Sequence, residues 1–474
     1  MATITSLGIG SGLDLNSIVD KLTALERRPL SQMKAAATQL QSQVSVFGKI
    51  QSLFGTLQDA SNALNSSSLW TQSVATSSNT AAVTATGGSG AAAGSYAVQV
   101  DKLASAQTLA SGSVFTSSGA LVGAGTLSLQ LGSFDATAGT FTPKDGATAV
   151  DIDITATDTL QTVRDKINAS AAGVSASLIT DASGVRLSLA SKTTGAANGF
   201  QVSSSSGDAA GLDRLAYDGT GGGGMQLKRA AGDAEATVNG IAVVSASNEL
   251  SGVVEGLTLG LRQVTTAPVS VTLAQDGESV TKAIRSFADA YNALSKYIAE
   301  QTRYDPASKT GGPLQGDSAT NSLTSRLRSI LNTPSGASST FSRLSDVGLQ
   351  LQRDGSLKVD DTKLTAAVAQ RTELQKAFSN NDVANPANSG FARRYAALAS
   401  AALGIDGALT TKADGLRKLI TLNSTEQTKV NNRADRFQER LVAQYTAMDA
   451  NLQKLNALSS YVTQQLAQMN KSTR

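Results

Sequence analysis

The chain has 474 residues, enough for about three domains with cores of their own, yet only 4% of them are aromatic and 16% are charged. It contains no Cys and no His, which excludes disulfides, Cys- or His-ligated zinc, Cys nucleophiles and Ser-His-Asp triads. The formal net charge of +3 is small and the basic residues are scattered among acids, so the composition argues against nucleic-acid binding.

The N-terminal region predicts two helices. Residues 1–8 contain neither a basic residue nor a continuous apolar core, so we expect no secretory signal peptide and another route if the protein is exported. Asp14 is the predicted cap of a short helix, which Pro29 ends or kinks. A longer helix is expected over residues 30–64. Its apolar stripe consists of Ala37, Leu40, Val44, Phe47, Phe54, Leu57 and Leu64.

The middle of the chain predicts strands. From about Ser73 the composition shifts to Ser, Thr, Gly and Ala, and residues 106–272 are expected to be β-rich with one helix at 158–168. The glycine run at 219–224 predicts a flexible hinge. Its letters satisfy G-x-G-x-x-G, but no strand-turn-helix pattern surrounds it, so we expect no dinucleotide site there.

Helical periodicity returns in the second half. A 4-3 apolar spacing predicts a helix that buries Val280, Ile284, Phe287, Tyr291, Leu294 and Ile298. A second helix is expected at 323–331. A hairpin is expected at 347–359, where Asp354 and Gly355 supply the turn. Helix resumes at 363–378, and nearly all of the chain from Phe391 onward is expected to be helical.

The C-terminal helix carries an apolar seam with a heptad spacing that only Ser459 interrupts. A seam needs a facing helix, and we expect neither end of the chain to have a tertiary core that buries its stripe. Eight such residues are worth about 12 to 24 kcal/mol gross, against ~4 to 15 kcal/mol for association. The ends therefore meet each other, as an intramolecular antiparallel pair, or they meet partners. The seam residues are Leu441, Tyr445, Met448, Leu452, Leu455, Val462, Leu466 and Met469.

These elements predict an α+β multidomain chain, in which a helical, coiled-coil-like stalk formed by both termini carries β-rich domains inserted in the middle of the chain. We expect five parts. They are N-terminal leg helices at 1–72 that pair with a coiled-coil leg helix at 415–474, a helical or mixed leg domain from 73–105 and 273–414, an outer β-rich domain with one helix at 106–224, and part of a second β-rich domain at 225–272.

Four stretches resemble the flagellar filament cap family, also called flagellar hook-associated protein 2. Residues 8–15 are similar to the family's opening, and 94–104 to its first strand. Residues 160–177 resemble the β-α-β motif that axial proteins of the flagellum share. The most specific match is 344–364, which is similar to the C-terminal domain signature. The resemblance covers both termini and most of the C-terminal half.

The resemblance implies a ring-shaped homo-oligomer at the extracellular tip of the growing filament, often a pentamer but with a subunit number that varies between bacteria. Members leave the cell through the flagellar type III channel without a cleaved signal peptide. The implied partners are flagellin, the hook-filament junction proteins and an export chaperone on the C-terminal helix. Neither an enzyme, a cofactor, a metal nor membrane insertion is implied, and no stretch reaches the ~20 apolar residues of a membrane span.

The predicted partner-binding residues are Leu13, Leu15 and Leu22 at the N-terminus together with Leu441, Tyr445, Met448, Leu452, Leu455, Val462, Leu466 and Met469. The alternative is that these residues only pack the two termini on each other. A second candidate function is a secreted adhesin that binds host mucin or glycans through residues 106–272. A hydrolase is not expected, because the S-x-x-K matches at 31–34 and 279–282 lack companion motifs.

Overall fold

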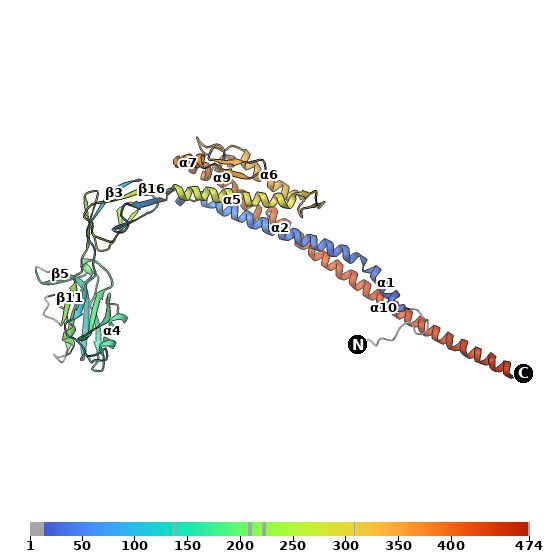
Figure 1. Ribbon diagram of the computed structural model, residues 1–474, viewed down its shortest axis with the longest axis horizontal. Helices are drawn as coiled ribbons and strands as arrows, with labels where there is room; N and C mark the ends of the chain where they lie inside the picture. Colours follow the sequence, from blue (N-terminus) through green and yellow to red (C-terminus); the bar gives the residue numbers. More distant parts are fainter. Residues whose placement is uncertain (1–13, 136–137, 207–210, 220–223, 308, 473–474) are drawn as a thin grey trace. The chain divides into compact units, whose positions relative to one another are not determined.

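The structure is a computed structural model that describes residues 14–135, 138–206, 211–219, 224–307 and 309–472. It divides into two compact units. Unit 1 takes the chain up to Ser66 and from Gly277 onward, and unit 2 is Ser67–Asp276. In chain order, the helical ends therefore flank a β-rich insertion, as the sequence predicted (Figure 1).

Unit 1 is mainly helical. Asp14 caps its first helix by accepting a hydrogen bond from the Ser17 amide at 3.0 Å, and Pro29 lies in the first turn of the second, where its missing N–H costs no bond. The elements are α1 (Leu15–Glu26), α2 (Arg28–Asn65), α5 (Gly277–Thr302), β17 (Tyr304–Asp305), β18 (Thr310–Gly311), α6 (Ser318–Asn332), β19 (Leu349–Leu351), β20 (Leu357–Val359), α7 (Asp361–Ala369), α8 (Arg371–Ser379), the 3₁₀ turn η3 (Pro386–Asn388), α9 (Phe391–Leu403) and α10 (Ala408–Ser472).

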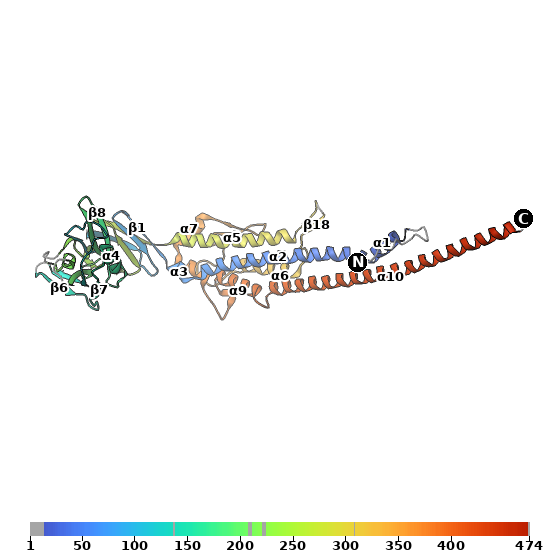
Figure 2. The same ribbon diagram turned by 90° about the horizontal axis from the view of Figure 1, so that it is seen from below.

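The core of unit 1 forms where α2 packs against α5, α9 and α10, which lie beside it in both views (Figures 1 and 2). All six predicted apolar positions of α5 are buried. So are Phe47, Phe54 and Leu57 on α2, each 0% exposed. The expectation that the N-terminal stripe has no tertiary core is therefore wrong for α2, because α5 and α9, more than 200 residues away in sequence, cover it.

The predicted hairpin is present as β19 and β20. Gly355 has a φ of +86°, a conformation that glycine adopts without the steric cost of a Cβ. The Asn292 side chain on α5 holds the hairpin, because its amide donates to the Leu357 carbonyl at 2.8 Å and accepts from the Leu357 amide at 2.6 Å. The amide therefore occupies the edge of β20 and fixes the hairpin on α5.

Unit 2 is built mainly from short strands. Its elements are α3 (Ser67–Thr71), β1 (Ser73–Ser77), β2 (Val83–Gly87), β3 (Gly94–Lys102), β4 (Thr108–Ser111), β5 (Gly125–Asp135), β6 (Thr140–Pro143), β7 (Val150–Ile154), α4 (Leu160–Ala169), β8 (Val174–Asp181), β9 (Gly184–Ser191), η1 (Ala196–Asn198), β10 (Gly199–Ser206), η2 (Leu212–Leu215), β11 (Met225–Arg229), β12 (Ala234–Val238), β13 (Ile241–Ser245), β14 (Glu249–Val254), β15 (Leu257–Leu261) and β16 (Val269–Gln275).

Two apolar cores organise these strands. One gathers residues between 109 and 225, where the buried face of α4 covers sheets ordered β10-β5-β6 and β11-β4-β9-β8, with β7 also paired to β5. The other gathers 82–104 with 234–273, in sheets ordered β1-β16-β3-β12-β13 and β14-β15-β2. All pairings within these sheets are antiparallel, and most join strands far apart in sequence.

One predicted grouping differs from the structure. The sequence predicts that residues 73–105 belong to a helical or mixed leg domain, but they form β1, β2 and β3 and belong to unit 2. The physical reason is pairing with distant strands. Ser73 lies opposite Gln275, and Val98 lies between Val238 and Val269, so this segment is an integral part of the sheet that residues 234–275 complete.

Glu373 on α8 gives unit 1 a predicted acid sensitivity. Its carboxylate accepts hydrogen bonds from Lys376 Nζ at 2.8 Å, Ser338 Oγ at 2.7 Å and the Ser339 amide at 2.9 Å. These bonds, that of Lys376 foremost, lower the pKa of Glu373 from its ordinary 4.5 to about 2. A depressed pKa in the folded state contributes stability above the unfolded pKa, and this stability is lost as the pH falls from about 4.5 toward 2.

We therefore expect Glu373→Gln to lower the melting temperature at pH 7. The difference in melting temperature between this variant and the wild type should shrink progressively below pH 4.5. Thermal melts of both proteins between pH 7 and pH 3 measure this convergence. A constant difference between the two proteins across that range would contradict the assignment.

Candidate functional site

The two ends of the chain meet along α10. Arg27 bonds Asp435 at 2.5 Å and Arg433 bonds Glu26 at 3.2 Å, so the junction between α1 and α2 is fixed on α10. Helices α1 and α10 run antiparallel (Figure 1). Because both helices rise by the same distance per residue, counting back from Glu26 along α1 and forward from Arg433 along α10 places Leu15 beside Tyr445. Leu15 is fully buried there. This part of the chain is the intramolecular helix pair.

Beyond that pair α10 has no cover in the described part of the chain. The helix has 65 residues, a length of about 95–100 Å at 1.5 Å per residue. From residue 453 to residue 468 every side chain is exposed. Both views show this segment continuing past α1 (Figures 1 and 2). An apolar seam of the kind that needs a facing helix is therefore open to solvent.

The predicted partner-binding residues fall into three groups. Leu15 is buried and Leu22 half-buried on α1, and on α10 Leu441, Tyr445 and Leu452 are half-buried. Leu13 and the Met469 side chain lie outside the described residues. The open group is Met448 at 37%, Leu455 at 59%, Val462 at 47% and Leu466 at 57% exposure. The seam therefore serves internal packing at one end and is free at the other.

Charge is nearly absent beside the open seam. With Leu455 and Val462 at heptad position d, the flanking e and g positions from 442 to 470 carry Val, Gln, Asn, Leu and Thr, and Asp449 is their one acidic residue. Flanking charges normally set partner choice and orientation in coiled coils. The open seam therefore carries few of the flanking charges that would restrict which apolar helix can face it.

Sequence reasoning missed an exposed apolar strand. On β13, Ile241 and Val244 are 70% and 66% exposed, on opposite faces of the sheet. A signal was present, since a five-residue strand without charge follows the turn residues Asn239 and Gly240. Leu458 and Tyr461, 58% and 59% exposed, also lie on the free part of α10 but outside the predicted seam.

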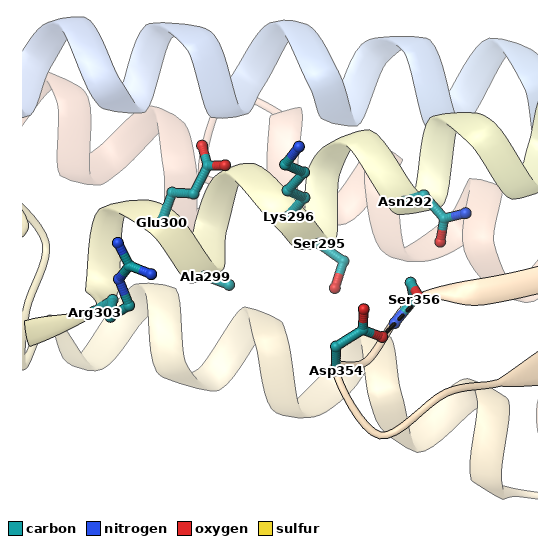
Figure 3. Close-up of a pocket in the computed structure, with 8 residues that line it drawn as sticks. All are labelled: Asn292, Ser295, Lys296, Ala299, Glu300, Arg303, Asp354 and Ser356. Carbon is teal, nitrogen blue, oxygen red and sulfur yellow. Dashed lines mark hydrogen bonds between the residues drawn. The ribbon is translucent and has the colours of Figure 1, made fainter.

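A cavity of about 420 Å³ lies beside α5 and the turn of the β19–β20 hairpin (Figure 3). Its described side chains form no catalytic arrangement. In the cavity Lys296 and Glu300 point away from the hairpin, whereas Ser295 points toward Asp354 and Ser356. Ser295 donates to the Gly355 carbonyl at 3.4 Å, so its hydroxyl serves the turn. The Asp354 carboxylate accepts hydrogen bonds from the Ser356 amide at 2.9 Å and from the Ser356 hydroxyl at 2.7 Å, so it stabilises the turn and is not bonded to Ser295 as the general base of a nucleophile would be.

The described residues form neither a metal site nor a membrane span. In the described ranges no three acidic side chains come together in a way that could hold a metal ion. No helix in that part of the chain combines the length and the hydropathy that crossing a bilayer requires. The open seam of α10 is therefore the strongest candidate site.

Family models match most of the chain. Residues 11–107 match the flagellar hook-associated protein 2 N-terminus, and residues 231–457 match its C-terminus. Between them, residues 134–193 match the flagellin hook IN motif, which spans α4 and the β8–β9 pair.

Whole proteins match over nearly their full length. Flagellar hook-associated protein 2 of Escherichia coli K12 is 34% identical, over 98% of both chains, and that of Salmonella typhimurium is 31% identical, over 100% of both. A crystal structure of the D1-D2-D3 domains of the flagellar cap protein FliD from Escherichia coli matches with a TM-score of 0.63 and 31% identity, covering 78% of this chain and 99% of that one. This chain therefore belongs to the flagellar hook-associated protein 2 family, the flagellar cap proteins, as its motifs predicted.

Proposed function

We propose that this protein sits at the tip of the growing flagellar filament as a ring-shaped homo-oligomer, with a pentamer as the expected form, where it retains exported flagellin and promotes its folding and insertion. The observation that carries the proposal is the open seam on α10. A helix that is fixed at its base by unit 1 and apolar at its free end is suited to docking between the helices of neighbouring subunits.

The magnitudes favour repeated binding and release. Burying Met448, Leu455, Val462 and Leu466 completely yields at most about 6–12 kcal/mol, which is comparable with the ~4–15 kcal/mol that association costs. One leg therefore binds weakly. Several legs in one ring bind together with a high effective concentration, so a single leg can leave its site while the others hold the assembly.

The remaining partners follow from the same surface. Hook-filament junction proteins present the first sites for the legs before any flagellin is in place. Inside the cell an export chaperone covers the apolar part of α10, and the protein then passes through the flagellar type III channel to the extracellular filament tip. Exposed apolar helices need such cover, because uncovered patches promote aggregation.

Deleting the gene tests the capping function. We expect the deletion strain to release flagellin into the medium as unpolymerised monomer, and the wild-type gene to restore filaments. Native mass spectrometry of the purified full chain tests the ring separately by giving the subunit number. Normal filaments in the deletion strain would refute the function, whereas a monomeric mass at all concentrations would refute the ring alone.

The alternative function, adhesion to host mucin or glycans, remains a prediction. It requires glycan affinity in residues 106–272. Glycan-array binding by the full chain that is lost on changing surface residues of this segment would support it.

A further inference from the structure

Strand β13 is an edge strand of the five-stranded sheet, and no strand pairs with its outer edge in the described part of the chain. It follows β12 through a two-residue turn, in which Asn239 and Gly240 have φ values of 49° and 81°, as a type I′ hairpin requires. In the strand order β1-β16-β3-β12-β13 it is the last strand, and within the described residues β12 is its one strand partner.

The register decides which backbone groups face outward. Ile241 lies opposite Val238 and Val243 lies opposite Ala236. In a two-residue hairpin the pair next to the turn is hydrogen-bonded, and the bonded pairs then alternate along the strands. Ile241, Val243 and Ser245 therefore bond to β12, whereas Ala242 and Val244 direct their N–H and C=O groups away from the sheet.

Nothing in the sequence of β13 blocks another strand from this edge. The strand reads Ile-Ala-Val-Val-Ser and has no charge, no proline and no register shift. Ile241 and Val244 expose 70% and 66% of their surface. An exposed apolar edge of this kind is a template for pairing with a further strand.

Three other edges of unit 2 carry protective features. The β8 edge is occupied by the Asn168 amide, which donates to the Ala176 carbonyl and accepts from its amide, both at 2.8 Å. Strands β11 and β14 each contain a register shift, and they bear Lys228 and Glu249 respectively. Strand β13 has none of the features that protect β8, β11 and β14.

We propose that β13 pairs with β13 of a second copy of this chain, antiparallel about a two-fold axis at Val243. In this register the outward groups of Ala242 meet those of Val244 of the second copy, which completes four backbone hydrogen bonds. Side-chain sizes also match, because Ala242 faces Val244 on one side of the sheet and Ile241 faces Ser245 on the other. The edge is therefore complementary to itself in backbone and in side chains.

The two-fold contact is distinct from the ring of the proposed function and does not rest on it. A two-fold contact joins copies in pairs, whereas a ring closes through head-to-tail contacts. Five residues bury far less than the ~1,000 Å² of a stable interface. The pairing is therefore weak between single chains, and it is strengthened when several copies are held together.

Cysteine cross-linking tests the register directly, because the chain has no Cys of its own. Across the proposed axis the two Val243 Cα atoms are ~4.5 Å apart, within disulfide range. The two Val244 residues are two positions apart along the strands and lie on different strands, so their Cα atoms are ~8 Å apart, beyond the ~7 Å limit. Under mild oxidation of the full chain we expect V243C to form covalent dimer about 5-fold faster than V244C, although Val244 is more exposed.

Two further experiments guard against the possibility that the V243C substitution itself disturbs the fold. An equimolar mixture of A242C and V244C chains, both changed at exposed positions, should cross-link through the Ala242–Val244 pair, whereas each alone should not. V243C/V244K should lose most of the dimer, because a charge on the edge opposes pairing. Cross-linking of V243C no faster than of V244C, together with no product from the mixture, would overturn the proposal. Failure of the cross-linking would not bear on the capping function. Bacteria that carry V244K alone should still swim whether or not the β13 strands pair.

Discussion

A chain that ends at Leu452 is expected to lose filament capping while unit 1 unfolds as before. The removed residues 453–468 are all exposed, so their loss breaks no described packing and should change the free energy of unfolding by less than about 0.5 kcal/mol. Three of the four open seam residues, Leu455, Val462 and Leu466, go with them, so the leg loses most of the apolar surface that it would dock. The measurement is flagellin in the culture medium of a deletion strain that carries the truncated gene, paired with a thermal melt of the purified protein.

Matched substitutions distinguish the effect of losing seam residues from the effect of shortening the helix. L455S/V462S removes two seam residues, whereas A457S/Y461S changes the same turns of α10 on other faces. Leu455 and Tyr461 are both 59% exposed, so the two variants lose comparable exposed apolar surface. We expect the first to release flagellin and the second to cap normally. An immunoblot of the medium shows whether each variant is exported, because failed export would also leave filaments uncapped. Equal capping activity of the two exported variants would contradict the proposal that the seam residues are needed for capping.

Elements with strong local signals were predictable from the sequence. The 4-3 spacing of α5 identified a helix whose six apolar positions are all buried, and the Asp354–Gly355 pair identified the hairpin. The motifs identified the family, and with it a structural protein of the flagellum rather than an enzyme. These features depend on residues close together in the chain.

The errors arose where distant partners decide the outcome. Residues 73–105 alternate weakly, and their place in the sheet depends on strands more than 130 residues downstream. Periodicity likewise shows that a helix has an apolar face without showing what covers it. Phe54 and Leu455 both lie on apolar stripes, yet one is fully buried and the other is 59% exposed. The location of the open seam, which is the functional question, therefore needed the structure.

Replacing Phe287 with Ala is expected to destabilise unit 1 by about 3–5 kcal/mol, the usual cost of truncating a buried aromatic residue. Phe287 is 0% exposed. Its ring lies 5.2 Å from that of Tyr395 and 6.3 Å from that of Phe378, both edge-on. The site cannot collapse easily, because Tyr395 is itself held by a 2.9 Å hydrogen bond from its hydroxyl to the Leu327 carbonyl. Truncation therefore leaves a cavity at the junction of α5, α8 and α9.

Calorimetry of the full chain measures this effect unit by unit. Since units 1 and 2 are separate compact bodies, we expect two thermal transitions. Phe287→Ala should lower the transition of unit 1 by roughly 6–20 °C and leave that of unit 2 in place. Phe200→Ala is the matched control, because Phe200 is equally buried in the core between residues 109 and 225 and should move the other transition. Phe287→Leu, which fills most of the cavity, should fall between Phe287→Ala and wild type. If Phe287→Ala lowered both transitions equally, the two units would unfold together, which would contradict the expectation of separate transitions. The rings of Phe287, Phe378 and Tyr395 would then stabilise the whole chain.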